Sequence, residues 1–121
     1  MFGIFGLLLP ENCNDRCVSA TIINRAYYSA YSYCKLWLFL KQGFTIKHPW
    51  EFKKSEKRKG EHKQIRDALY DFGEETMGSE LRNLAILRNK ADYNIYSEIT
   101  DDDLCNAINH MKCIFNHLKL D

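Results

Sequence analysis

Several catalytic signatures are missing from this sequence. It has no glycine-rich phosphate loop, no nucleophile-elbow serine and no paired-carboxylate hydrolase pattern. Its most apolar stretch, residues 1–10, is too short to span a bilayer, and it lacks the basic start and the cleavage site of a secretory signal. These absences argue against a P-loop NTPase, a serine hydrolase and an integral membrane protein.

Excess charge and cysteine pairing are also missing. The net charge of +1 provides no overall attraction to nucleic acid or membrane, so any electrostatic argument must be local. The five cysteines are an odd number without paired spacing, and Cys34 lies in an apolar helix as a small core residue. We therefore expect a cytoplasmic protein without disulfides.

Helical periodicity is what the sequence does contain, and no segment alternates cleanly enough to require a strand. The 121 residues suffice for one domain with a real core. Gly43 is a plausible stop for the first helix, and Thr100 is an N-cap followed by three aspartates. Short connections favour antiparallel neighbours, so the expected fold is all-α, an up-and-down bundle of about four helices. The expected helices are 16–42, 61–73, 76–92 and one beginning after Thr100.

Two flanking features are less regular. Residues 1–15 form an N-terminal arm, which we interpret as a packing arm or the remnant of a longer helix rather than a weak membrane contact. At the end of the first helix, residues 36–40 are apolar all round, and we expect them to be buried on several sides.

The connection at 44–60 carries the strongest local charge. Between Lys47 and Arg66 there are eight basic residues against three glutamates, a surplus of five. This pattern fits either a solvated, mobile loop or a phosphate-binding surface with Trp50 and Phe52 as stacking groups. The candidate phosphate contacts are Lys53, Lys54, Lys57, Arg58, Lys59 and Lys63.

Arg88 stands where a helical apolar stripe requires a hydrophobic residue. Its guanidinium is always charged and is costly to bury without a partner. Asp92, four residues later, is the nearest candidate, and a phosphate or a second subunit would also serve. The arginine is therefore either one half of a structural ion pair or a functional group. The stripe consists of Met77, Leu81, Leu84 and Ala91.

Two other residues are candidates for the same chemistry. His62 lies at the start of the second helix, where the helix N-terminus lowers a histidine pKa and attracts phosphate, although a capping or packing role is the simpler interpretation. Arg25 could share a phosphate with Arg88 or pair with a carboxylate such as Asp92, and we favour the pairing.

A metal site is not expected. His110, Cys113 and His117 share one face of the last helix, away from its apolar stripe. Three ligands on one straight helix cannot enclose a tetrahedral ion, so zinc would need a second element.

Three segments read NRAYYSAY (residues 24–31), GEHKQI (residues 60–65) and LRNKADY (residues 87–93). In this order, they resemble the HEPN superfamily, and within it the small prokaryotic HEPN-domain proteins. The resemblance covers most of 20–120 and implies a HEPN-like bundle. Family members usually carry an earlier helix, so that helix is short here or the start codon is misplaced.

The resemblance implies a metal-independent ribonuclease of a toxin–antitoxin or RNA-defence system, acting as a homodimer without a cofactor. Such enzymes pair an arginine with a histidine, with four to six residues between them. Arg88 matches the arginine, but Tyr93 occupies the place of the histidine. A phenol of pKa near 10 is a poor base, so Asp92, Tyr93 and His62 are candidates to orient or protonate the substrate.

The alternative is a non-catalytic HEPN module. It would bind a nucleotide or a nucleotidyltransferase-like antitoxin, and neither hypothesis involves a membrane.

Overall fold

The computed structural model describes residues 15–121, and its described part is all-α without strands. The expected arm, apart from its last residue, lies outside this range. The predicted helices are confirmed to within one or two residues at each end. They are α2 (Asp15–Gln42), α3 (Glu61–Asp71), α4 (Glu75–Tyr93) and α5 (Asp101–His117), with a short 3-10 helix η1 (Pro49–Glu51).

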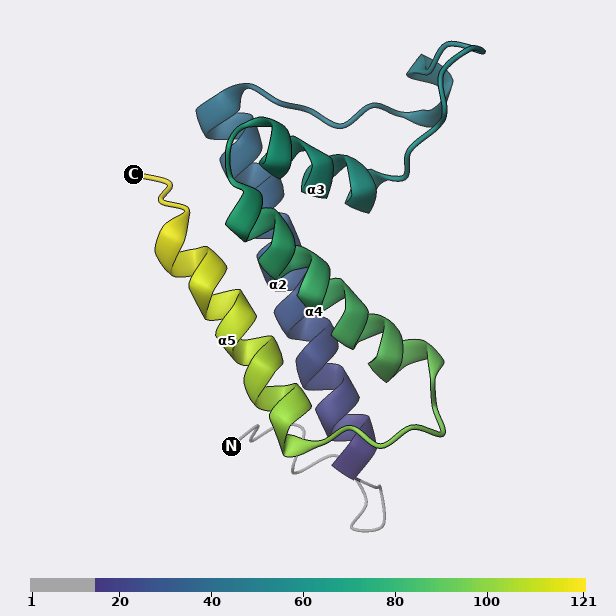
Figure 1. Cartoon of the computed structure of the whole chain (residues 1–121), viewed down its shortest axis with the longest axis vertical. Helices are drawn as coiled ribbons and strands as arrows, with labels where there is room; N and C mark the ends of the chain where they lie inside the picture. Colours follow the sequence, from purple (N-terminus) through teal and green to yellow (C-terminus); the bar gives the residue numbers. More distant parts are fainter. Residues whose placement is uncertain (1–14) are drawn as a thin grey trace.

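The three long helices pack side by side with alternating direction, and the short α3 lies across one end of them (Figure 1). α5 packs against α2 and α4, whereas α3 contacts α2 and α4 but not α5 to any large extent. The connection between α2 and α3 extends outward, with η1 near its outer end. This arrangement confirms the all-α, four-helix prediction; the three long helices run up and down, whereas α3 crosses them. Within residues 15–121, no helix combines the length and hydropathy that a membrane crossing requires.

Local signals end and begin the helices as predicted. Gly43 follows α2 with φ of 67°, a left-handed conformation that favours glycine, and its N–H donates to the Phe39 carbonyl. Thr100 caps α5, because its hydroxyl accepts from the Asp103 N–H at 3.1 Å while the Asp103 carboxylate accepts from the Thr100 N–H at 3.0 Å.

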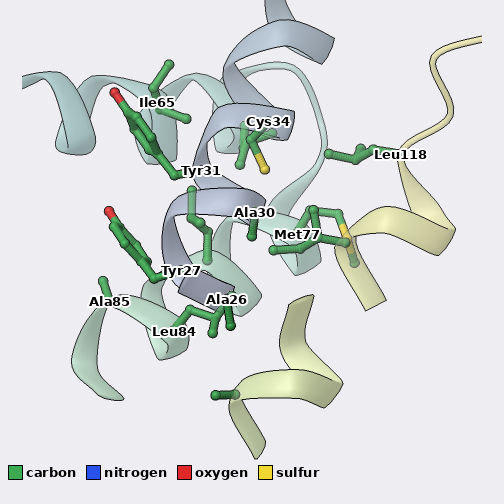
Figure 2. Packing of buried hydrophobic residues seen from close by; sticks show 14 of the residues in the cluster. Ala26, Tyr27, Ala30, Tyr31, Cys34, Ile65, Met77, Leu84, Ala85 and Leu118 are labelled. Atoms are coloured by element: carbon green, nitrogen blue, oxygen red, sulfur yellow. The ribbon is translucent and has the colours of Figure 1, made fainter. Parts of the chain in front are cut away.

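The core forms where α2 meets the other helices. Ala26 and Ala30 are small and buried, so neighbouring helices can approach α2 closely (Figure 2). Cys34 is fully buried, as predicted, and burial raises the pKa of its thiol to about 12. The hydroxyls of Tyr27 and Tyr31 point away from this centre, toward one side of the bundle. That side carries the candidate site.

The prediction for residues 36–40 was wrong. Leu38 is buried and Trp37 half-buried, but Leu36, Phe39 and Leu40 are exposed, Phe39 by 54%. The reason is that α2 is covered at this end only on the sides that face α3, α5 and the connection.

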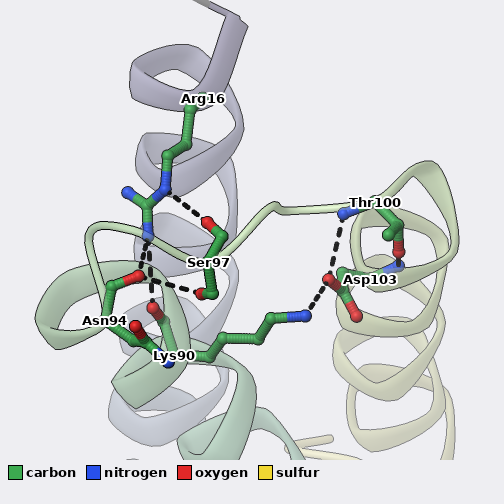
Figure 3. A network of polar contacts seen from close by, with 6 residues as sticks. All are labelled: Arg16, Lys90, Asn94, Ser97, Thr100 and Asp103. Carbon is green, nitrogen blue, oxygen red and sulfur yellow. Dashed lines mark hydrogen bonds and ion pairs between the residues drawn. The ribbon is translucent and has the colours of Figure 1, made fainter.

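Arg16 links the first turn of α2 to the connection between α4 and α5 (Figure 3). Its guanidinium donates hydrogen bonds to four backbone carbonyls at 2.7–3.3 Å. Lys90, which supplies one of them, also pairs with Asp103 at 2.7 Å. The side chains of Arg16 and Lys90 therefore link α2, α4 and α5. The carbonyls belong to Lys90, Ala91, Asn94 and Ser97.

We expect Arg16→Ala to lower the free energy of unfolding by about 1–2 kcal/mol, because partly exposed carbonyls lose charge-assisted bonds but regain water. Urea denaturation followed by circular dichroism measures this change. Arg25→Ala is the matched control, since Arg25 is an exposed arginine of the same helix without a partner in residues 15–121. Equal midpoints for the two variants would contradict the prediction.

Candidate functional site

Arg88 forms its ion pair within its own helix, α4, and this pair was one of the alternatives that the sequence left open. Its Nε donates to the Asp92 carboxylate at 3.2 Å and its Nη2 donates to the Tyr93 hydroxyl at 3.1 Å. The side chain is 17% exposed. Burial alone would lower the pKa of Arg88, but the hydrogen bond and charge of Asp92, together with Tyr28 and Tyr93, raise the pKa above its ordinary value. Its Nη1 has no hydrogen-bond partner in the described chain.

Three tyrosine rings surround this guanidinium. Its Cζ lies 5.5 Å from the ring centre of Tyr27, 5.4 Å from that of Tyr28 and 5.6 Å from that of Tyr93. All three distances are within the range of cation–π attraction. Tyr27 is buried, whereas Tyr28 and Tyr93 are exposed. The guanidinium of Arg88 is therefore surrounded by aromatic rings, and two of these rings, those of Tyr28 and Tyr93, reach the protein surface.

Asp92 joins α4 to α2 through Asn24, whose Nδ2 donates to its carboxylate at 3.0 Å. The favoured pairing of Arg25 with Asp92 was therefore wrong. Successive helical residues point about 100° apart, so Asn24 faces α4 while Arg25 faces solvent. Arg25 makes no side-chain hydrogen bond or ion pair with residues 15–121.

His62 reaches the same tyrosines from α3. Its Nδ1 forms a hydrogen bond with the Tyr27 hydroxyl, and its ring stacks on Tyr31 with centres 4.3 Å apart. Its ring edge also meets Tyr28, with centres 6.0 Å apart. Burial raises the pKa of Tyr27 to about 12, so this phenol stays protonated and can donate to His62 or accept from it. Nε2 has no partner in the described chain.

The pKa of His62 is lowered, first by burial and second by the positive charge of Arg88. Glu61 opposes this shift but does not reverse it. The direction agrees with the sequence prediction, although the cause is burial and a nearby cation rather than the helix end alone. His62 is therefore neutral at pH 7, and like Arg88 it contacts Tyr27 and Tyr28.

The basic connection divides into paired and unpaired cations. Lys59 and Lys63, both predicted phosphate contacts, instead pair with Asp67 at 2.9 and 3.7 Å. Phe52 is also not a free stacking group, because it is half-buried beneath Lys47 and lines a cavity of about 580 Å³ against α3. Trp50 is 77% exposed. Within the basic connection, four exposed cations have no side-chain partner among the described residues, namely Lys53, Lys54, Lys57 and Arg58.

The three potential zinc ligands of α5 face acidic residues of α4. His110 pairs with Glu80, and His117 lies 3.4 Å from Glu74. Cys113 packs against the core rather than away from it, and burial, with Glu80 second, raises the pKa of its thiol. In residues 15–121, no group of three or more histidine, cysteine or acidic residues is placed to hold a metal ion.

Sequence reasoning missed Asn24 and the stacking of Tyr31 on His62. Asn24 and Tyr31 lie on the same face of α2 as Tyr28, at spacings of four and three residues. This helical spacing is the sequence pattern that could have identified them. Comparison of the chain with protein-family models, curated proteins and solved structures gives no match. The function must therefore be inferred from the site itself.

Proposed function

We propose that this protein is a HEPN-type, metal-independent ribonuclease in which Arg88 binds the scissile phosphate and His62 is the general base. One observation carries the proposal. His62 from α3 and Arg88 from α4 both contact Tyr27 and Tyr28 of α2, so a histidine shares two aromatic neighbours with the arginine although none follows it at the motif spacing.

The chemistry requires no metal. Neutral His62 takes the proton of a ribose 2′-hydroxyl at Nε2, and the 2′ oxygen forms a bond to phosphorus. The phosphorus–O5′ bond breaks, and Tyr93 supplies the proton for the departing oxygen. The imidazolium of His62 then releases its proton to solvent, from which the Tyr93 phenol is restored. The products are a 2′,3′-cyclic phosphate and a 5′-hydroxyl, while Arg88, oriented by Asp92, stabilises the negative charge on the phosphate.

The resemblance adds the biological setting. It supports a cytoplasmic role in a toxin–antitoxin or RNA-defence system, with a nucleotidyltransferase-type antitoxin as partner. A homodimer belongs to the same proposal, but Arg88 is not a reason for it, because its partners Asp92 and Tyr93 lie in the same chain.

A second function has its own supporting observation. Two nitrogens of Arg88 are engaged within α4, and Asp92 links that helix to Asn24. Such a network also suits a binding module, in which the arginine fixes the helices and the protein binds a nucleotide or a partner without cleavage.

Incubation of mixed RNA with purified protein in EDTA separates the two functions. The ribonuclease predicts cyclic-phosphate ends that depend on both Arg88 and His62. Intact RNA at every protein concentration, from a folded protein, would reject the ribonuclease and favour the binding module.

A further inference from the structure

One face of α2 runs from the candidate site toward the basic connection. Tyr28 contacts Arg88, Tyr31 stacks on His62, and Lys35 pairs with Glu61 at 2.6 Å. Phe39 continues the same face one turn later. At 1.5 Å per residue, Tyr28 and Phe39 are about 16 Å apart along the axis, the length of about five stacked nucleotides.

A hollow of about 450 Å³ lies at the far end of this face, between α2, α3 and the connection. Phe39, Phe44 and Ile65 make its apolar wall, and Lys35, His48 and Glu51 contribute polar groups. Aromatic and polar groups together in a hollow of this size suit a planar, hydrogen-bonding ligand such as a nucleobase.

Trp50 stands beside the hollow and forms a stacking platform. Its ring is parallel to that of His48, with centres 4.6 Å apart and planes 10° apart. Because His48 lines the hollow, the platform and the hollow are continuous. Trp50 remains 77% exposed, so most of its surface is open to another flat ring.

The charges around Trp50 are not balanced. Glu56 accepts from Lys47 and from the backbone of Lys53, and Glu51 accepts from the backbone of His48. These carboxylates therefore leave Lys53, Lys54, Lys57 and Arg58 without ion pairs in the described chain. Figure 1 places η1, the start of α3 and the second half of α4 along one side of the molecule.

We propose that Trp50 and these four cations are a second contact for single-stranded RNA, and that the strand continues from there past Phe39 along α2 to Arg88, with about five nucleotides between Phe39 and Tyr28. The direction toward Arg88 rests on the proposed function. Stacking on Trp50 requires an unpaired base, which excludes a duplex. The adjacent residues 53–59 contain no large apolar side chain, so a membrane would gain only one inserted ring.

The test measures binding of uridine oligonucleotides with 2′-O-methyl groups, which the protein cannot cleave because the nucleophile is blocked. Fluorescence anisotropy compares a trinucleotide with an octanucleotide. We expect Trp50→Ala to weaken octanucleotide binding roughly tenfold and trinucleotide binding at Arg88 by less than about twofold. Removing Lys53 and Lys54 together should reduce the salt dependence by about 1.4 in log–log slope.

Tyr96→Ala is the matched control, because Tyr96 is a 96% exposed aromatic residue in the connection between α4 and α5. Octanucleotide binding that is equal in the two variants would overturn the proposal, as would equal binding of an RNA duplex. A last measurement uses vesicles of phosphatidylcholine and phosphatidylserine. If the protein binds these vesicles through Trp50 but does not bind the oligonucleotide, the ligand of this surface is a lipid membrane instead of RNA.

The same measurements separate this proposal from the ribonuclease. If the protein does not cleave RNA but binds the octanucleotide through Trp50, the second RNA contact is supported and the ribonuclease is rejected. If the protein cleaves RNA but Trp50→Ala leaves its octanucleotide affinity unchanged, the ribonuclease is supported and the second contact is rejected.

Discussion

Arg88→Ala is expected to reduce RNA cleavage in EDTA by at least about a hundredfold. The guanidinium lies 5.4–5.6 Å from the ring centres of Tyr27, Tyr28 and Tyr93, and Asp92 already orients it. Loss of one preorganised donor to a developing oxyanion typically costs about a hundred- to a thousandfold. The measurement is the initial rate of cyclic-phosphate formation from a labelled RNA.

Two further variants separate charge from geometry. Arg88→Lys keeps the charge but loses the planar fork, so we expect it to recover only a small part of the rate. Arg82→Ala removes an exposed arginine of the same helix that has no partner in the described residues, and we expect it to cleave like the wild type. Wild-type cleavage by Arg88→Ala would reject the assigned role.

Stability tells a structural arginine from a functional one. In Arg88→Ala, Asp92 keeps its hydrogen bond from Asn24, so we expect unfolding to become easier by only about 1–2 kcal/mol and the fold to survive. A larger loss in the free energy of unfolding would favour the non-catalytic module, provided that the cleavage rate falls only in proportion to the fraction of protein that remains folded.

His62→Ala should lower the cleavage rate by about a hundred- to ten-thousandfold, the usual contribution of a general base. His62→Gln keeps a polar group of similar size and should be equally inactive, because an amide cannot accept the proton. His117→Ala removes an exposed histidine of α5 and serves as the control. Full activity of His62→Gln would exclude His62 as the base.

The pH dependence gives an independent check on His62. Because its pKa lies below the ordinary value of 6.5, kcat/KM should remain high at neutral pH and fall only as the pH drops below 6.5. The unfolded chain binds this proton more readily than the folded chain, so stability should also fall with pH in that window and stay level above 6.5. Both changes should disappear in His62→Gln, and an acid limb above 6.5 would contradict the assignment.

The sequence by itself determined the elements and their ends. Apolar periodicity, Gly43 and the Thr100 cap depend on interactions between residues a few positions apart, and such interactions are the same in any fold. The pairing of Arg88 with Asp92 was predictable for the same reason, because residues four apart on a helix are neighbours.

Only the tertiary structure decided which residues complete the site. The rotation of α2 turns Asn24, and not Arg25, toward Asp92, and the crossing of α3 brings His62 onto Tyr27 and Tyr31. Composition alone also suggested that residues 36–40 would be buried, yet Phe39 is left open because no helix in the described chain covers that side. These outcomes depend on how whole helices rotate and cross, which is the sum of many distant contacts and leaves no short pattern in the sequence.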